Sequence, residues 1–156
     1  MKIRQKAVKL TSTFFYIGCL PLIPGTFGSI AGIGLFYLVK DNPLAYCLLV
    51  VFLLAAGFWS GAQAEVIFNK KDPKYVVIDE VCGMLLSLAF LPCYNFKIVI
   101  SAFFLFRFFD TLKIYPACRL QEIKGSMGIM IDDLVAALYT NIILQVVLRF
   151  AWCKTS

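Results

Sequence analysis

Histidine is absent from the 156-residue chain, and charged residues are scarce. Without histidine, the chain can form neither a Ser-His-Asp hydrolase site nor a phosphohistidine intermediate. The chain also has no D-x-D sequence, and no cysteine is followed by an arginine six positions later. The usual signatures of aspartyl-phosphate hydrolases and of cysteine phosphatases are therefore missing. A zinc site is disfavoured too, because no C-x-x-C pair compensates for the lack of histidine.

Charged residues make up 15% of the chain and hydrophobic residues 61%. Soluble domains have about a quarter charged residues, so we expect lipid to be the solvent for much of this protein. The length suits a single domain over residues 1–156, in which residues 1–20 form a basic N-terminal tail. The formal net charge of +6 does not indicate nucleic acid, because the basic residues lie in short clusters between apolar runs. We expect membrane lipid, and no nucleic acid, as a partner.

Five apolar runs predict helices, at residues 27–39, 43–64, 81–93, 98–109 and 134–148. The second run is long enough to cross a hydrocarbon core of about 30 Å, whereas the first and third would reach only about 20 Å. We therefore predict an all-α fold, a small polytopic membrane helical bundle of about four to five membrane helices with short or re-entrant members. Within the second run, Gly57 and Gly61 form a G-x-x-x-G motif, which lets another helix approach closely.

Lysine and arginine are unevenly distributed around these runs. Eleven of the fifteen lie in the N-terminal tail, in the two longer loops, 65–79 and 110–131, or, for Arg107, just before the second of these loops. Five helices would place the tail and both loops on the same side of the membrane. The positive-inside rule assigns that side to the cytoplasm.

Acidic and basic residues gather where three of these helices meet the predicted cytoplasmic loops. They are Asp79 and Glu80 in VVIDEVCG (76–83), Arg107, Asp110 and Lys113 in FRFFDTLKIYP (106–116), and Asp132 and Asp133 in GSMGIMIDDLVAA (125–137). Carboxylates so placed repel one another unless a cation lies between them, and each ionisable group at membrane depth costs roughly 2.5 kcal/mol or more. Mg²⁺ takes oxygen ligands, commonly one or two carboxylates together with substrate phosphate. The pattern favours a metal site.

Two simpler interpretations stay open for these residues. Asp79 and Asp132 could each be an ordinary helix N-cap, with the neighbouring acid favoured by the helix dipole. Arg107 and Asp110 could form an i, i+3 ion pair that neutralises both groups near the membrane interface.

A proline–glycine turn, PGTFGSIAG at 24–32, leads directly into the first apolar run. Thr26 and Ser29 offer hydroxyl groups there, and exposed N–H groups at the start of a helix can hold a phosphate. The segment is not a Walker A loop, because no Gly-Lys-Ser/Thr follows. Together with the missing signatures, it favours metal-assisted attack on a phosphate.

These motifs, in this order, resemble those of the phosphatidylglycerophosphatase A family. The likeness covers PGTFGS, Asp72 with VVIDEVCG, LFRFFDTLKIYP and GIMIDDLVAA, from about residue 20 to 140. It implies a helical enzyme of the bacterial inner membrane that uses Mg²⁺ to hydrolyse the terminal phosphate of phosphatidylglycerophosphate. The residues that it implicates are Thr26, Ser29, Asp79, Glu80, Arg107, Asp110, Lys113, Asp132 and Asp133. Ile114, Ser126 and Ala137 depart from the family pattern, and none of these changes removes a charged group.

We therefore expect Asp79, Glu80, Asp132 and Asp133 to hold one or two Mg²⁺ ions. Arg107, Lys113 and the turn with Thr26 and Ser29 would bind phosphate, and Asp110 would be a further ligand or the base that orients water. Three alternatives remain: a small ion-coupled membrane transporter, an enzyme like the CDP-alcohol phosphatidyltransferases, and a soluble helical protein that only binds metal. The transferase signature D-G-x-x-A-R is absent, and a transporter would favour acids in the middle of its spans rather than at one end.

Overall fold

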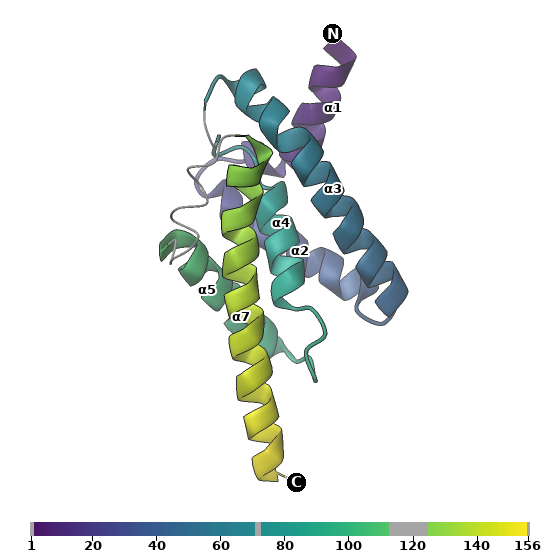
Figure 1. Ribbon diagram of the computed structural model, residues 1–156, viewed down its shortest axis with the longest axis vertical. Coiled ribbons are helices and arrows are strands. Elements are labelled where there is room, and N and C mark those ends of the chain that lie inside the picture. Colours follow the sequence, from purple (N-terminus) through teal and green to yellow (C-terminus); the bar gives the residue numbers. More distant parts are fainter. Residues whose placement is uncertain (1, 71–72, 113–124, 156) are drawn as a thin grey trace.

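The computed structural model describes residues 2–70, 73–112 and 125–155, and within them it is helical without a strand (Figure 1). The elements are α1 (Lys2–Ser12), the 3-10 helix η1 (Ile17–Cys19), α2 (Pro24–Val39), α3 (Pro43–Phe68), α4 (Ile78–Ser87), α5 (Phe96–Leu112) and α7 (Ser126–Thr155). The all-α prediction is confirmed for this part of the chain.

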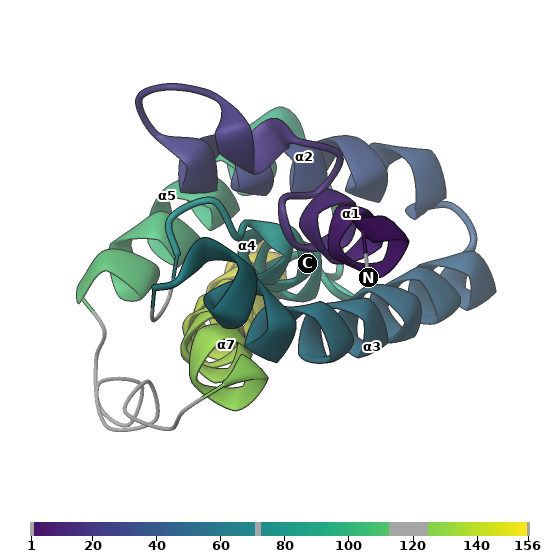
Figure 2. The same cartoon turned by 90° about the horizontal axis from the view of Figure 1, so that it is seen from above.

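Helix α4 forms the centre of the bundle. It contacts α2, α3, α5 and α7, and the view in Figure 2 shows these longer helices arranged around it. Eight of its ten residues are buried. A helix this short spans about 15 Å, too little to cross a hydrocarbon core. Its role is to carry the first acidic motif into the middle of the other helices.

The apolar run 81–93 was expected to be helical throughout, but α4 ends at Ser87. Phe90 adopts a positive φ of 51°, and Pro92 cannot continue a helix. The side chain of Asn141, on α7, donates to the carbonyl oxygens of Ser87 and Ala89 at 3.1 and 2.8 Å. It thereby satisfies carbonyl groups that the end of a helix leaves without partners.

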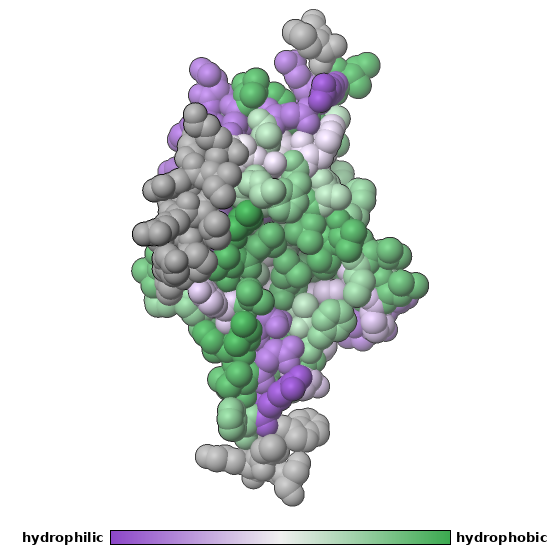
Figure 3. Space-filling model, viewed as in Figure 1, coloured by the Kyte–Doolittle hydropathy of each residue, from purple (hydrophilic) through white to green (hydrophobic). Residues whose placement is uncertain are grey.

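Two helices, α3 and α7, are long and apolar enough to cross a membrane by length and composition. The other described helices are shorter, and α2 has 16 residues. Figure 3 shows an apolar band over the middle of the molecule, with polar residues at the end that carries the N-terminus and a second polar group below the band, toward the C-terminus.

The packing predicted for the G-x-x-x-G motif of α3 is confirmed, and the partner is α7. A Cβ on Gly57 would lie 2.6 Å from Met130 Sδ, and one on Gly61 would lie 3.0 Å from Ser126 Cα. Close approach at these two glycines places the start of α7, which carries the third acidic motif, beside the end of α3.

The basic N-terminal segment is more ordered than the expected tail. Residues Lys2–Ser12 form α1, which packs on α3 and buries Val8. The carbonyl oxygen of Ser12 accepts a hydrogen bond from the backbone N–H of Val77 at 3.0 Å. This contact connects α1 to the residue immediately before α4.

Candidate active site

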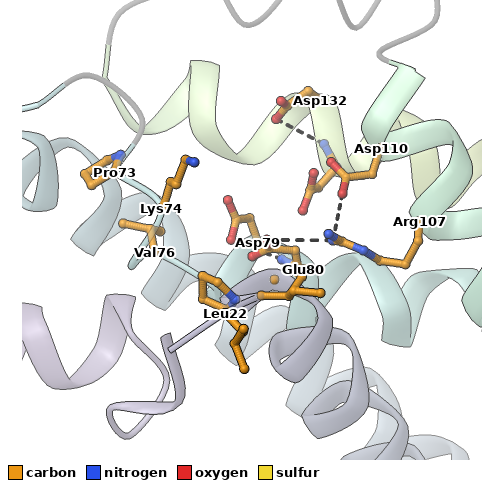
Figure 4. Close-up of a pocket in the computed structure, with 13 residues that line it drawn as sticks. Leu22, Pro73, Lys74, Val76, Asp79, Glu80, Arg107, Asp110 and Asp132 are labelled. Atoms are coloured by element: carbon orange, nitrogen blue, oxygen red, sulfur yellow. Dashed lines mark hydrogen bonds and ion pairs between the residues drawn. The ribbon is translucent and has the colours of Figure 1, made fainter. Parts of the chain in front are cut away.

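The three charged motifs meet in a cavity of about 290 Å³ at one end of the bundle (Figure 4). Its lining residues are Leu22, Ile23, Pro24, Gly25, Pro73, Lys74, Val76, Asp79, Glu80, Arg107, Asp110, Asp132 and Asp133. They come from α4, α5, α7, the start of α2 and the segments that precede α2 and α4. Every acid that the sequence implicated lines this one cavity.

Three of the five acids converge most closely. Asp79, Glu80 and Asp133 each offer an oxygen such that all three atoms lie within 4.8 Å of one another. Asp79 and Glu80 lie in the first turn of α4, and Asp133 lies in the second turn of α7. The two helices approach at Gly83, where a Cβ would lie 2.6 Å from the ring of Phe106 and 3.3 Å from the carbonyl oxygen of Asp133. Only a small residue at position 83 allows this convergence.

The two aspartate pairs share a local arrangement that differs from the N-cap interpretation. The backbone N–H of Glu80 donates to Asp79 Oδ1, and that of Asp133 donates to Asp132 Oδ1, each at 3.1 Å. The N-cap of α4 is Val77 rather than Asp79, and Asp132 lies six residues inside α7. The interpretation of Asp79 and Asp132 as ordinary N-caps is therefore wrong.

Arg107 is the cation closest to the acids among the described residues. Its Nη1 lies 2.7 Å from Asp110 Oδ2 and 3.8 Å from Glu80 Oε1. The i, i+3 pair with Asp110 is confirmed. It holds the guanidinium of α5 against the first turn of α4, inside the cavity.

Acidic side chains in the cavity are only partly neutralised by the basic side chains that line it. Burial raises the pKa of Glu80 to about 8, with Asp133 and Asp110 adding repulsion and Arg107 opposing it. Glu80 Oε2 and Asp133 Oδ2 are buried and accept no hydrogen bond from any residue that the structure describes. Five acidic and two basic side chains line the cavity, so acidic groups outnumber basic ones. Clustered carboxylate oxygens without donors are what a hard divalent cation requires, so the residues present fit Mg²⁺.

Asp132 lies beside this group without belonging to it. It lines the cavity and is only 7% exposed, but its oxygens are not among the three that converge. Its predicted role as a metal ligand stays a prediction.

The proline–glycine turn contributes to the cavity by allowing close approach of its backbone to the acids. Gly25 lies against the acids, and a Cβ there would be 2.2 Å from Glu80 Oε1 and 3.1 Å from both terminal nitrogens of Arg107. Ser29 is fully buried, and its hydroxyl donates to the carbonyl oxygen of Gly25 at 3.1 Å. Thr26 is partly buried and is not in the cavity lining. Direct phosphate binding by Thr26 and Ser29 stays a prediction.

Some lining residues were not expected from the sequence. Lys74, Leu22 and Ile23 line the cavity, although the sequence placed Lys74 only on the cytoplasmic side and gave no role to the other two. Nothing distinguishes Lys74 from other loop lysines before the fold is known. The predicted phosphate ligand Lys113, and Asp72, lie outside the described residues.

Comparison with known proteins gives a consistent result. The family model of phosphatidylglycerophosphatase A matches residues 10–148. A protein of Bacteroides thetaiotaomicron named "Putative phosphatidylinositol-3-phosphatase" is 35% identical over 88% of this chain and 91% of its own length. No solved structure matches.

Two further relatives carry the family name. Phosphatidylglycerophosphatase A of Escherichia coli (strain K12) is 35% identical over 81% of this chain and 75% of its own length. That of Haemophilus influenzae (strain ATCC 51907 / DSM 11121 / KW20 / Rd) is 31% identical over 87% of this chain and 85% of its own length. The family match, like the resemblance of the motifs, includes each acid that lines the cavity, and the chain therefore belongs to the phosphatidylglycerophosphatase A family of phosphatases.

Proposed function

We propose that this protein is a Mg²⁺-dependent lipid phosphatase that converts phosphatidylglycerophosphate into phosphatidylglycerol and inorganic phosphate. The observation that carries the proposal is the convergence of Asp79, Glu80 and Asp133, with two buried oxygens that accept no hydrogen bond, in a chain of this family. A cavity of about 290 Å³ lies at the lower end of ligand-site volumes. It suits a phosphorylated headgroup, while the acyl chains stay outside.

Asp79, Glu80 and Asp133 would hold the metal, with Asp132 close enough to the group to assist. Bound Mg²⁺ would polarise the phosphoryl oxygens and favour attack by water. The chain's own residues position the phosphate. Arg107 is held by Asp110 through Nη1, which leaves its second terminal nitrogen for a phosphate oxygen.

Asp110 and Gly25 complete this arrangement. While Asp110 Oδ2 holds Arg107 Nη1, the other oxygen of the Asp110 carboxylate would orient water or accept its proton. Gly25 leaves room for the Glu80 carboxylate, because any side chain at position 25 would occupy the same space. Lys113 is expected to add a second cation for the phosphate.

The proposed location is the inner membrane of a bacterium, with the cavity facing the cytoplasm. α3 and α7 would cross the bilayer, and shorter helices beside them would give the four to five membrane helices expected from the sequence. The excess of lysine and arginine at the end that carries the cavity supports the cytoplasmic assignment. Lipid substrate would then reach the cavity from the headgroup layer.

Membership of a phosphatase family argues against the transporter, the phosphatidyltransferase and the soluble metal-binding protein. A second substrate is worth testing, because the Bacteroides relative is named for phosphatidylinositol 3-phosphate. That lipid also carries a phosphate monoester on a headgroup joined to diacylglycerol through a phosphodiester. The two substrates therefore present the same reacting group at a similar distance from the bilayer.

Phosphate release by the purified protein in detergent tests the proposal. The substrates are phosphatidylglycerophosphate, phosphatidylinositol 3-phosphate and phosphatidic acid, each with Mg²⁺ and then with a chelator. We expect the fastest release from phosphatidylglycerophosphate and loss of release with chelator. Faster release from phosphatidylinositol 3-phosphate would make that lipid the preferred substrate and would contradict the proposed one. Release that continues in the presence of chelator would contradict the proposed role of Mg²⁺.

A further inference from the structure

Lys74 is a cation of the cavity that the site chemistry described so far does not use. It lines the cavity together with the acids, yet its residue is exposed. Figure 4 shows it on the opposite side of Asp79 from Arg107. The two cations therefore flank the acidic group rather than sharing one position.

A tight turn holds Lys74 in this place. The backbone N–H of Val76 donates to the carbonyl oxygen of Pro73 at 2.9 Å, and that of Val77 donates to Ser12 at 3.0 Å. Pro73 and Val76 are buried, so both sides of the turn are fixed, while Lys74 between them is exposed and lines the cavity. Its position is determined by the fold, and only its four-carbon stem is free to adjust.

The two cations differ in what neutralises them. Arg107 is paired with Asp110 and Glu80. Lys74 forms no ion pair with any residue in the described ranges 2–70, 73–112 and 125–155. A lysine that lines an acidic cavity, and that pairs with no carboxylate in those ranges, is available to an anionic group of the ligand.

The proposed substrate has a second anionic group in a suitable place. Its terminal phosphate, which must reach the acids and the metal, is joined through one glyceryl unit to a phosphodiester, and the diacylglycerol follows. The cavity holds a headgroup only, so the phosphodiester lies near its mouth when the terminal phosphate is bound. Leu22 and Ile23 also line the cavity and are 93% and 56% exposed, which offers an apolar surface to the diacylglycerol beyond it.

From this arrangement we infer that Lys74 binds the phosphodiester of the substrate and makes the enzyme selective for lipids that carry one. The inference rests on the proposed function. In phosphatidic acid the phosphate monoester is attached directly to diacylglycerol, so that lipid has no anion left for Lys74 once its phosphate is bound. Lys74 is thus a specificity-determining residue, separate from the residues that act on the reacting phosphate.

The test compares two lipids with identical acyl chains, phosphatidylglycerophosphate and phosphatidic acid, in neutral detergent micelles with Mg²⁺. Lys74→Met removes the charge and keeps an unbranched stem. We expect its kcat/KM for phosphatidylglycerophosphate to fall about tenfold, mainly through KM, as for the loss of one charge-assisted hydrogen bond. We expect its kcat/KM for phosphatidic acid to change far less, so that the ratio of the two values falls by nearly the same factor.

Two variants control for charge and structure. Lys74→Arg keeps the cation and should restore most of the ratio. Lys70→Met removes the same charge from an exposed lysine of the same loop that does not line the cavity, and should leave the ratio at the wild-type value.

Equal losses on both lipids, or no loss in Lys74→Met, would overturn the inference while the proposed function stands. A fall in the ratio for Lys70→Met as large as for Lys74→Met would also overturn it, because the effect would then be one of net charge. A wild-type enzyme that releases no phosphate from phosphatidylglycerophosphate would overturn both.

Discussion

The two ends of the α4–α7 interface differ in how their polar groups are satisfied. At the end far from the cavity, Asn141 donates to the carbonyl oxygens of Ser87 and Ala89, and Gln145 donates to that of Phe90 at 3.1 Å. At the cavity end, Glu80 Oε2 and Asp133 Oδ2 are buried without a hydrogen bond. The same pair of helices is joined by side-chain hydrogen bonds at one end, whereas at the other end it buries carboxylate oxygens without a donor among the described residues.

This difference separates structural polar residues from functional ones. A buried polar group with a partner contributes to stability, whereas one without a partner costs about 1–3 kcal/mol and more when charged. Gln145 Oε1 also lacks a partner, but it is a neutral amide oxygen. Two carboxylate oxygens in that condition, side by side, indicate a site that is completed by something other than the protein.

The largest effect is expected from Asp133→Asn at the cavity end. The change removes one of the three converging carboxylates, so kcat should fall roughly a thousandfold, in the range for loss of a group that stabilises transition-state charge. Folding should be little affected, since the variant also removes repulsion among buried acids. Phosphate release and thermal unfolding in detergent measure the two effects.

Mg²⁺ provides the control for this variant. Saturating Mg²⁺ should raise the unfolding temperature of the wild type, because a ligand that binds only the folded state stabilises it. The rise should be much smaller in Asp133→Asn. Full activity in the variant would remove Asp133 from the site and would leave the contrast between the two ends without a functional meaning.

The acids were predictable from the sequence because charge stands out in an apolar chain. Asp79, Glu80, Asp132 and Asp133 occur where apolar runs meet charged loops, and the topology rule already places those positions on one side. The rule does not give distances, however. The sequence therefore grouped four metal ligands, whereas the structure brings Asp79, Glu80 and Asp133 together with Asp132 beside them.

Other features depend on contacts between distant parts of the chain, which local patterns do not contain. Gly25 meets Glu80 and Arg107, which are far from it in sequence. The sequence of the turn around Gly25 is compatible both with phosphate binding and with close packing. Only the fold shows that Gly25 packs closely against Glu80 and Arg107. The end of α4 at Ser87 is similar, since the side chain that satisfies its carbonyl comes from Asn141.

The next largest effect is expected from Gly25→Ala. The new Cβ would lie 2.2 Å from Glu80 Oε1, so either the carboxylate or the start of α2 must move. A displacement of about 1 Å in a catalytic site can cost about a hundredfold in rate, and we expect a loss of kcat of that order. Steady-state kinetics with phosphatidylglycerophosphate measures it.

Gly34→Ala is the matched control, because it makes the same change in the same helix. A Cβ at position 34 would have no neighbour within 4 Å. The variant should keep wild-type activity and gain up to about 1 kcal/mol of stability, as alanine replaces glycine inside a helix. Equal activity of the two variants would show that the cavity tolerates a side chain at position 25.

At the opposite end of the interface, Asn141→Leu should affect stability and leave catalysis unchanged. It leaves the carbonyl oxygens of Ser87 and Ala89 without their donor, which should lower the free energy of unfolding by about 2 kcal/mol. Thermal unfolding in detergent and kcat per folded molecule distinguish the two effects. A loss of kcat comparable to that of Asp133→Asn would mean that the two ends are coupled.

The smallest effect is expected from Leu22→Gly. This variant distinguishes the effect of the backbone conformation at position 22 from the effect of the leucine side chain. Leu22 has a φ of 87°, in the left-handed region that favours glycine, and its side chain is 93% exposed at the edge of the cavity. Glycine relaxes that backbone, so stability should hold or rise slightly. If the side chain contacts the acyl part of the substrate, KM for phosphatidylglycerophosphate should rise about fivefold, as for losing part of the burial of one leucine.

Leu38→Ala, at a leucine that is 81% exposed near the far end of α2, should not change KM. An unchanged KM in Leu22→Gly would mean that the apolar edge of the cavity faces water or lipid without binding substrate, and the strained backbone at Leu22 would then have no explanation in catalysis.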